Sequence, residues 1–174
     1  MVCALGRTGH AILIDCRDLS TKAVPLPEGT AVVVMDTATR RGLVGTAYND
    51  RRAECEAAAA FLGVPALRYA PMSAVREKPK YLPPAPWHRA RHVIGEIQRT
   101  AEAAQAMRQA DTKLLGRLMN QSHDSLRDDF EVTNTELDQM VTIARKAAGC
   151  IGARMTGAGF GGCAVALVEV ECVS

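Results

Sequence analysis

The feature that most constrains the fold of this chain is GARMTGAGFGG, residues 152–162, which holds five glycines in eleven positions. Glycine at this density is typical of a backbone that approaches something closely, because glycine has no Cβ. Gly157, Gly159 and Gly162 fit the dinucleotide-binding pattern G-x-G-x-x-G, which needs a strand before the loop and a helix after it. We predict a helix before this loop and a strand after it, so the dinucleotide interpretation fails.

A phosphate-binding loop of the Walker A type is also excluded, because no Lys-Ser or Lys-Thr pair follows the glycines. Two interpretations stay open. One is a tight turn that packs against a neighbouring element, and the other is a loop close to a phosphate group. Arg154 and Thr156 favour the second, since a guanidinium and a hydroxyl beside backbone N–H groups suit anionic oxygens.

Periodicity and turn residues predict a mixed chain. Residues 11–16 and 31–35 are short β-branched runs, and the loop signal PLPEGT between them predicts two strands joined by a turn. Four prolines in residues 77–86 indicate a linker or rigid loop. The remaining predicted elements are helices over 46–63, 87–111, 112–126 and 133–149, the last opened by a capping box of Thr133 and Glu136, and a strand over 163–171.

Charge and cysteine content narrow the class of partner. There are 21 Lys+Arg against 19 Asp+Glu, with no block of one sign, which favours small-molecule partners over nucleic acid or a membrane surface. No stretch is long and apolar enough for a membrane span or a signal peptide. The six cysteines lie apart in apolar or small-residue runs, which predicts buried, unpaired thiols in a reducing, cytoplasmic compartment.

Other groups of polar residues have a structural and a chemical interpretation each. His88 and His92 have the i, i+4 spacing of a metal site, but no third ligand accompanies them, so we favour a structural role. His123 with Asp124, Asp128 and Asp129 could form an acid–base cluster, although capping or ion pairing is the commoner role. Arg51 and Arg52 could meet phosphate, although a salt-bridged helix face is the commoner arrangement.

Several segments together are specific enough to indicate a family. GARMTGAGFGGCAVALV resembles the third signature of galactokinases, which belong to a wider group of small-molecule kinases that includes homoserine and mevalonate kinases. Four further segments resemble galactokinases in the same order: LGRTGHAILIDCRDL, AYNDRRAECEAAAAFLGV, RARHVIGEIQRT and LMNQSHDSLRDDFEVTNTELD. The resemblance covers most of the chain and corresponds to the C-terminal half of these enzymes.

The resemblance implies a reaction in which ATP phosphorylates D-galactose to galactose 1-phosphate, with Mg²⁺ between the phosphates. Galactokinases also carry a sugar signature of the type G-R-x-N-L-I-G-E-H-x-D-Y and an ATP signature of the type P-x-G-x-G-L-S-S-S-A, and neither occurs here. Their catalytic aspartate, in G-I-M-D-Q, would lie just before Met1. We therefore expect no catalytic residue in these 174 residues, no activity of the chain alone, and a missing N-terminal segment.

The resemblance also assigns the candidate site residues. Tyr48, in AYNDRR, corresponds to a tyrosine that contacts the sugar in galactokinases. The residues expected near the nucleotide phosphates are Arg154, Thr156, Gly157, Ala158, Gly159, Phe160, Gly161 and Gly162. No residue is assigned to a metal.

The expected fold is α+β. Residues 1–80 would complete an N-terminal, galactose-binding kinase domain, and residues 81–174 would form a ferredoxin-like C-terminal domain without its last elements. We expect a monomer that binds galactose and ATP. The alternative is a non-catalytic galactokinase-like fragment that binds sugar or complements an N-terminal partner chain.

Overall fold

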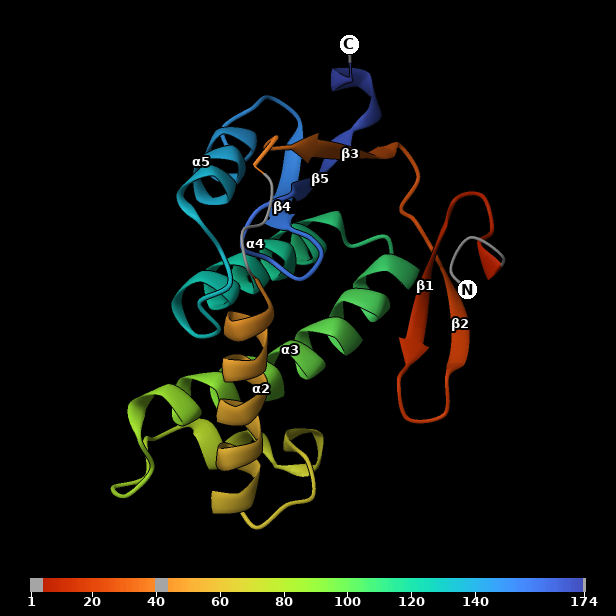
Figure 1. Cartoon of the computed structure of the whole chain (residues 1–174). Coiled ribbons are helices and arrows are strands. Elements are labelled where there is room, and N and C mark those ends of the chain that lie inside the picture. Colours follow the sequence, from red (N-terminus) through yellow and green to blue (C-terminus); the bar gives the residue numbers. More distant parts are fainter. Residues whose placement is uncertain (1–4, 40–43, 174) are drawn as a thin grey trace.

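The computed structural model describes residues 5–39 and 44–173, and within them the chain is α+β, as predicted. Two antiparallel sheets are joined to a set of packed helices (Figure 1). The strands are β1 (His10–Asp15), β2 (Ser20–Pro25), β3 (Thr30–Asp36), β4 (Cys150–Met155) and β5 (Cys163–Glu169). The helices are α2 (Val44–Phe61), α3 (Pro84–Arg108), α4 (Thr112–Asp128) and α5 (Thr135–Ala144), with short 3₁₀ turns at Leu67–Tyr69, Met72–Val75 and Val170–Cys172.

The prediction that the strands near residues 11–16 and 31–35 form a hairpin is wrong. β1 pairs with β2, with Ile12 opposite Ala23, whereas β3 belongs to the second sheet. The sequence of β2, STKAVP, is polar and mostly exposed, so it lacks the apolar run by which a strand is recognised. The hairpin forms because β1 supplies the apolar partner.

The second sheet has the order β3-β5-β4, and all its neighbours are antiparallel. β3 lies in the part assigned to the N-terminal domain and β5 in the part assigned to the C-terminal domain, so this sheet draws strands from both sides of residue 80. A boundary there stays a prediction. α5 packs on one face of the sheet, where Val141 and Ala144 contact Ala153, Ala164 and Ala166.

The helices follow the predicted ranges closely, because their apolar periodicity is regular. α3 begins at Pro84, with prolines in its first turn, where a missing N–H costs no helical hydrogen bond. α4 then lies directly on β4. A Cβ added to Gly116 would fall 2.0 Å from the carbonyl oxygen of Ile151, so only glycine permits this close approach of helix and strand.

Two local predictions are corrected by the structure. The N-cap of α5 is Asn134 rather than Thr133, since the Asn134 side chain accepts a 2.9 Å hydrogen bond from the Leu137 amide. Cys16 and Cys172 are exposed and not buried, whereas Cys55, Cys150 and Cys163 are partly buried and unpaired. Cys3 lies outside the described residues. No helix of the described ranges has the length and apolar character needed to cross a membrane.

We expect Asn134→Ala to lower the free energy of unfolding by about 1 kcal/mol, because it removes the side chain that caps α5. Thr133→Ala is the matched control and should change stability by less than half as much. Urea denaturation of both variants measures the difference. Equal losses would show that the capping box predicted from the sequence forms instead.

Candidate functional site

The glycine loop joins β4 to β5, so a strand both precedes and follows it. The predicted helix before the loop is wrong, because residues 150–155 form a strand. The dinucleotide interpretation fails all the same, since the loop leads into β5 and no helix follows it directly. The backbone has positive φ at five loop positions: Gly157, Gly159, Phe160, Gly161 and Gly162.

Two of these glycines are required by packing against neighbouring backbone. A Cβ at Gly159 would lie 2.1 Å from the Val132 carbonyl oxygen, and one at Gly161 would lie 2.9 Å from the Thr39 carbonyl oxygen. The Thr37 amide and hydroxyl both donate to the Gly162 carbonyl, at 3.0 and 2.7 Å. The Phe160 amide donates to Val132 at 2.7 Å, which fixes the loop to the segment after α4.

Gly157 and Ala158 are instead exposed and face a cavity of about 320 Å³. Within the described ranges, the amides of these two residues donate to no protein acceptor. Tyr48 and Arg52 of α2 line the opposite wall. The complete lining is Tyr48, Arg51, Arg52, Cys55, Leu126, Phe130, Val132, Gly157, Ala158 and Phe160.

This cavity, called the loop cavity below, brings together the two parts of the site predicted separately from sequence. Tyr48 is 56% exposed, so its ring is available to a ligand and is not a core residue. Gly157, Ala158 and Phe160 lie in the same lining, while Thr156 is exposed beside them. Gly159, Gly161 and Gly162 are not in the lining, and their positive φ angles set the path of the loop backbone.

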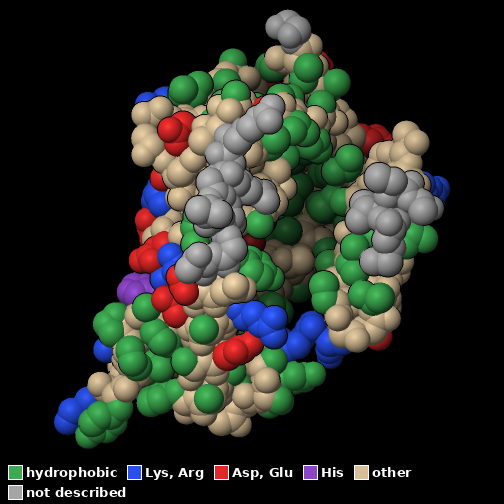
Figure 2. All heavy atoms as spheres, in the orientation of Figure 1, with side chains coloured by type: hydrophobic (Ala, Val, Ile, Leu, Met, Phe, Trp, Pro, Cys, Tyr) green, Lys and Arg blue, Asp and Glu red, His purple; other side chains and the backbone are tan. Residues whose placement is uncertain are grey.

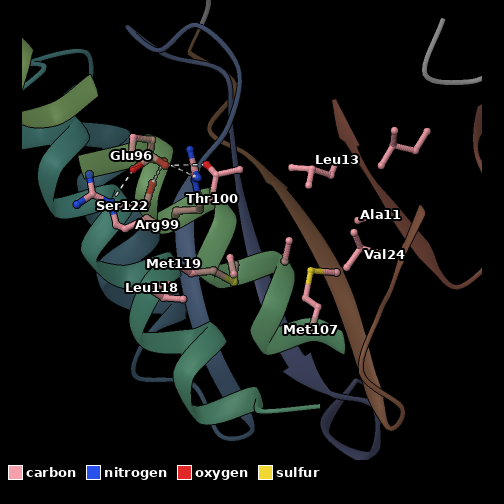
Figure 3. A pocket seen from close by; sticks show the side chains of 14 residues that line it. Ala11, Leu13, Val24, Glu96, Arg99, Thr100, Met107, Leu118, Met119 and Ser122 are labelled. Atoms are coloured by element: carbon pink, nitrogen blue, oxygen red, sulfur yellow. Dashed lines mark hydrogen bonds and ion pairs between the residues drawn. The ribbon is translucent and has the colours of Figure 1, made fainter. Parts of the chain in front are cut away.

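Arg154 does not face the loop cavity. Its guanidinium donates to Glu96 of α3 at 3.1 Å, and it lines a second cavity of about 200 Å³ between the β1–β2 hairpin and α3–α4 (Figure 3). Burial works against the charge of Glu96, but Ser122, Arg154 and Arg99 together lower the pKa of its carboxyl. The Arg154 side chain points away from the glycine loop because side chains alternate between the two faces of a strand. The next residue of β4, Met155, is buried with Leu137 on the other face.

The second cavity is mainly apolar. Leu13 and Val24 from the hairpin face Met107 and Met119 from the helices (Figure 3), and Figure 2 shows hydrophobic side chains around the hollow beside the hairpin. Its polar groups are concentrated at one end, where Arg99 and Ser122 both bond Glu96. Glu96 has several donors, but Arg99 Nη2 is buried and has no hydrogen-bond partner among the described residues.

The backbone that carries Val132 is held by a buried guanidinium. Arg89 of α3 is 2% exposed and donates to Glu54 of α2 at 2.6 Å, to Glu131 at 2.7 Å and to the Asp129 carbonyl. Burial alone would lower the pKa of Arg89, but the hydrogen bonds to Glu54 and Glu131 raise it above its ordinary value. We call residues 129–132 the strap, because they join α4 to α5 beneath the glycine loop.

Arg51 adds a second attachment to the strap. Its guanidinium donates to the carbonyl oxygens of Phe130 at 2.7 Å and Glu131 at 3.2 Å. Arg52, one residue on, is exposed and pairs with Glu56 at 2.8 Å. The ion-paired helix face expected for both residues is therefore confirmed. Of the two, only Arg52 keeps its guanidinium largely in solvent at the cavity wall.

Cys55 is a partly buried residue in the α2 wall of the loop cavity. Burial raises the pKa of its thiol to about 11, so the thiol is protonated at neutral pH and is a poor nucleophile. The Cys55 side chain has a structural role: it packs, like Val93, against the core cluster that contains Ala58 and Ala59.

The histidines have structural partners, as favoured from sequence. His88 Nδ1 lies 3.2 Å from Asp129 Oδ1, and His92 Nδ1 lies 2.9 Å from Ser125 Oγ while its ring stacks on Phe130. No group of three metal-ligating side chains occurs within residues 5–39 and 44–173.

The cluster around His123 is also structural. His123 is 1% exposed, accepts a hydrogen bond from the Met155 amide at 3.3 Å, and has Asp138 on its other side. Asp124 pairs with Arg145 at 2.9 Å, Asp128 pairs with Arg127, and Asp129 binds Arg91. Every carboxylate of the proposed acid–base cluster thus has an arginine partner.

Sequence reasoning missed Arg89 and the strap. Arg89 occupies an amphipathic helix where an arginine normally faces solvent, and nothing in RARHV marks it as buried. The sequence signal for a buried arginine is the pair of carboxylates that it binds: Glu54, which lies near Arg51 and Arg52, and Glu131, which lies near Asp129. Their convergence on Arg89 depends on tertiary packing of α2 against α3.

Known proteins resemble this chain in sequence and in fold. Residues 103–171 match the family model described as GHMP kinases C terminal. The crystal structure of Lactococcus lactis galactokinase complexed with galactose has 37% sequence identity and a TM-score of 0.87, over 97% of this chain and 45% of that chain. L. major mevalonate kinase in complex with R-mevalonate has 21% identity and a TM-score of 0.58, over 92% of this chain and 41% of that chain, which shows a shared fold. The chain thus spans less than half the length of either protein.

We expect Arg89→Leu to lower the free energy of unfolding by about 3 kcal/mol, because it leaves the Asp129 carbonyl without its donor and leaves Glu54 with only the longer 3.3 Å bond from Arg51. Arg52→Leu is the matched control, also an arginine in an ion pair, but exposed; it should cost less than about 1 kcal/mol. Urea unfolding compares the two. Amide exchange at Phe160 should quicken in the first variant only, and equal behaviour of the two would contradict the role of Arg89.

The buried His92 predicts acid sensitivity. Burial lowers its pKa from 6.5 to about 4, so below pH 6.5 the unfolded chain takes up a proton that the folded chain does not. The folded state should lose up to about 1.4 kcal/mol per pH unit from this group between pH 6.5 and 4. His92→Gln should be less stable at neutral pH and show a shallower loss in that window. If the free energy of unfolding of the variant falls with pH as steeply as that of the original chain, groups other than His92 cause the loss of stability in acid.

Proposed function

We propose that the chain is the C-terminal half of a galactokinase, because residues 103–171 match the family model described as GHMP kinases C terminal and the likeness to a galactokinase runs over nearly the whole chain. Together with an N-terminal half it would phosphorylate D-galactose with ATP to give galactose 1-phosphate. The observation that carries the proposal is the loop cavity, in which Tyr48 and the glycine loop face each other.

In this proposal Tyr48 contacts the sugar and the loop lies near the phosphates of ATP. The exposed amides of Gly157 and Ala158, with Arg52 across the cavity, are a donor set that suits anionic oxygens. The described residues do not fit Mg²⁺ in the same way, since they provide no set of three ligands.

The proposed contribution of this half is positioning. Phosphoryl transfer depends on holding the sugar hydroxyl, the phosphates and the charged groups in line. The strap, fixed by Arg89 and Arg51, sets the distance between the α2 wall with Tyr48 and the loop. The base that takes the hydroxyl proton would come from the other half, because no G-I-M-D-Q segment occurs in this sequence.

The test combines this chain with the part of Lactococcus lactis galactokinase that it does not cover. We expect the mixture, but not this chain alone, to form galactose 1-phosphate from galactose and ATP with Mg²⁺. In the active mixture, Tyr48→Ala should raise KM for galactose roughly ten-fold, the loss of one ligand hydrogen bond, with a smaller change in kcat. Tyr81→Ala, an exposed tyrosine outside the cavity, is the matched control.

Product formed by the chain alone, or an unchanged KM in Tyr48→Ala, would contradict the proposal. Calorimetry of the chain with galactose distinguishes half of an enzyme from a module that binds sugar on its own. One contact from Tyr48 should give no measurable heat, whereas a module that senses sugar on its own would bind with a saturable signal.

A further inference from the structure

The strand that leads into the glycine loop, β4, is covered by β5 on one edge and by α4 on the other. Two glycines allow α4 to come this close. A Cβ at Gly116 would lie 2.0 Å from the Ile151 carbonyl oxygen, and one at Gly152 would lie 2.6 Å from the Gly116 carbonyl oxygen. This contact fixes the position of α4 along the strand.

His123 is level with the end of β4 as a result. It follows Gly116 by seven residues, which is about two helical turns and a rise of roughly 10 Å on the same helix face. Met155 follows Gly152 by three residues of strand, which is also roughly 10 Å. The two lengths match, so His123 reaches the last residue of β4.

The end of β4 is therefore held from both sides. The Met155 amide donates to His123 Nδ1 at 3.3 Å, and the next amide, that of Thr156, donates to the Cys163 carbonyl at 2.9 Å. Within residues 5–39 and 44–173, no hydrogen bond holds the loop backbone between Thr156 and Phe160. The direction of this short stretch depends on how its two ends are fixed.

The bond to Met155 also determines where the His123 ring carries its proton. Nδ1 accepts the bond, so the proton of the neutral ring is on Nε2, which lies 3.3 Å from Asp138 Oδ1. Burial lowers the pKa of His123, with a contribution from Arg145 and against the effect of Asp138. The ring is therefore neutral at pH 7, and Nδ1 is able to accept.

We propose that His123 is a positioning residue for the glycine loop: its Nδ1 holds the Met155 amide and so sets the direction in which the amides of Gly157 and Ala158 face the loop cavity. Where it concerns ATP, this inference rests on the proposed function, in which these two amides bind phosphate oxygens. His123 is 1% exposed and is not in the cavity lining, so it acts through Met155 and not as an acid or a base.

Two variants separate the hydrogen bond from the packing of the ring. His123→Leu fills the site without an acceptor, whereas His123→Asn keeps a side-chain oxygen near the position of Nδ1 but leaves more empty space. Both should lower the free energy of unfolding. Relative to the amides of α3, the Met155 amide should exchange about ten-fold faster in His123→Leu and within about two-fold of the original rate in His123→Asn.

The NMR spectrum of the whole chain reports the loop directly. The amide chemical shifts of Gly157 and Ala158 should move in His123→Leu and stay in place in His123→Asn. The matched control is Asn120→Leu, which removes the bond that Asn120 Oδ1 accepts from the Ala153 amide at 3.0 Å. It should quicken exchange of the Ala153 amide and leave the shifts of Gly157 and Ala158 unchanged.

Kinetics of the mixture with the uncovered part of Lactococcus lactis galactokinase test the consequence for ATP. His123→Leu should raise KM for ATP about ten-fold with KM for galactose unchanged, and His123→Asn should restore KM for ATP. Asn120→Leu should leave KM for ATP as it is. A variant that is only less stable would contain less active enzyme, so its apparent kcat would fall and both KM values would stay the same.

An unchanged exchange rate of the Met155 amide in His123→Leu, or a faster rate that asparagine does not reverse, would overturn the role of His123. An unchanged KM for ATP in His123→Leu would overturn its part in the reaction. A mixture of the original chain that forms no product would contradict the proposed function instead. In that case the exchange of Met155 and the shifts of Gly157 and Ala158 would still decide whether His123 holds the loop.

Discussion

The buried guanidinium of Arg89 is the interaction on which the rest of the site depends. It joins α2 through Glu54, α3 through its own backbone, and the strap through Glu131 and the Asp129 carbonyl. A charge this deeply buried is tolerated only when its donors are satisfied, so α2 and the strap must hold fixed positions relative to α3. The strap in turn presents the Val132 carbonyl to the Phe160 amide, which fixes the glycine loop. Disturbing Arg89 therefore disturbs the loop from a distance.

The glycine loop now has a more definite interpretation than its composition allowed. Tight packing and phosphate proximity were two alternatives, and the structure divides the glycines between them. Gly159 and Gly161 are required by the carbonyl oxygens of Val132 and Thr39, so these positions are explained by sterics alone. Gly157 and Ala158 face the cavity with exposed backbone, and they are the positions where a ligand interpretation applies.

Sequence alone predicted the helices well and the sheets poorly, for a physical reason. α3 and α4 carry a regular apolar period, which is a local property. β2 is polar and β4 contains Gly152, so each is a strand only because a partner strand provides its hydrogen bonds. The same limit affected the site. Tyr48 and the loop were found from the family resemblance, but Arg154 was placed beside the loop because the strand that turns its side chain toward Glu96 was not predicted.

The charges around the loop cavity indicate how the work of phosphoryl transfer would be divided. Arg51 lies in the wall, but its donors are used by the strap, and Arg52 pairs with Glu56 at the exposed edge. Among the residues that the structure describes, the side chains at the loop cavity therefore leave little positive charge for a triphosphate, and the backbone amides of the loop are the main donors there. Amides can orient phosphate oxygens but do not balance several negative charges. If the proposed function is correct, further neutralising groups must come from outside the described residues of this chain, while this half determines where the sugar and phosphates meet.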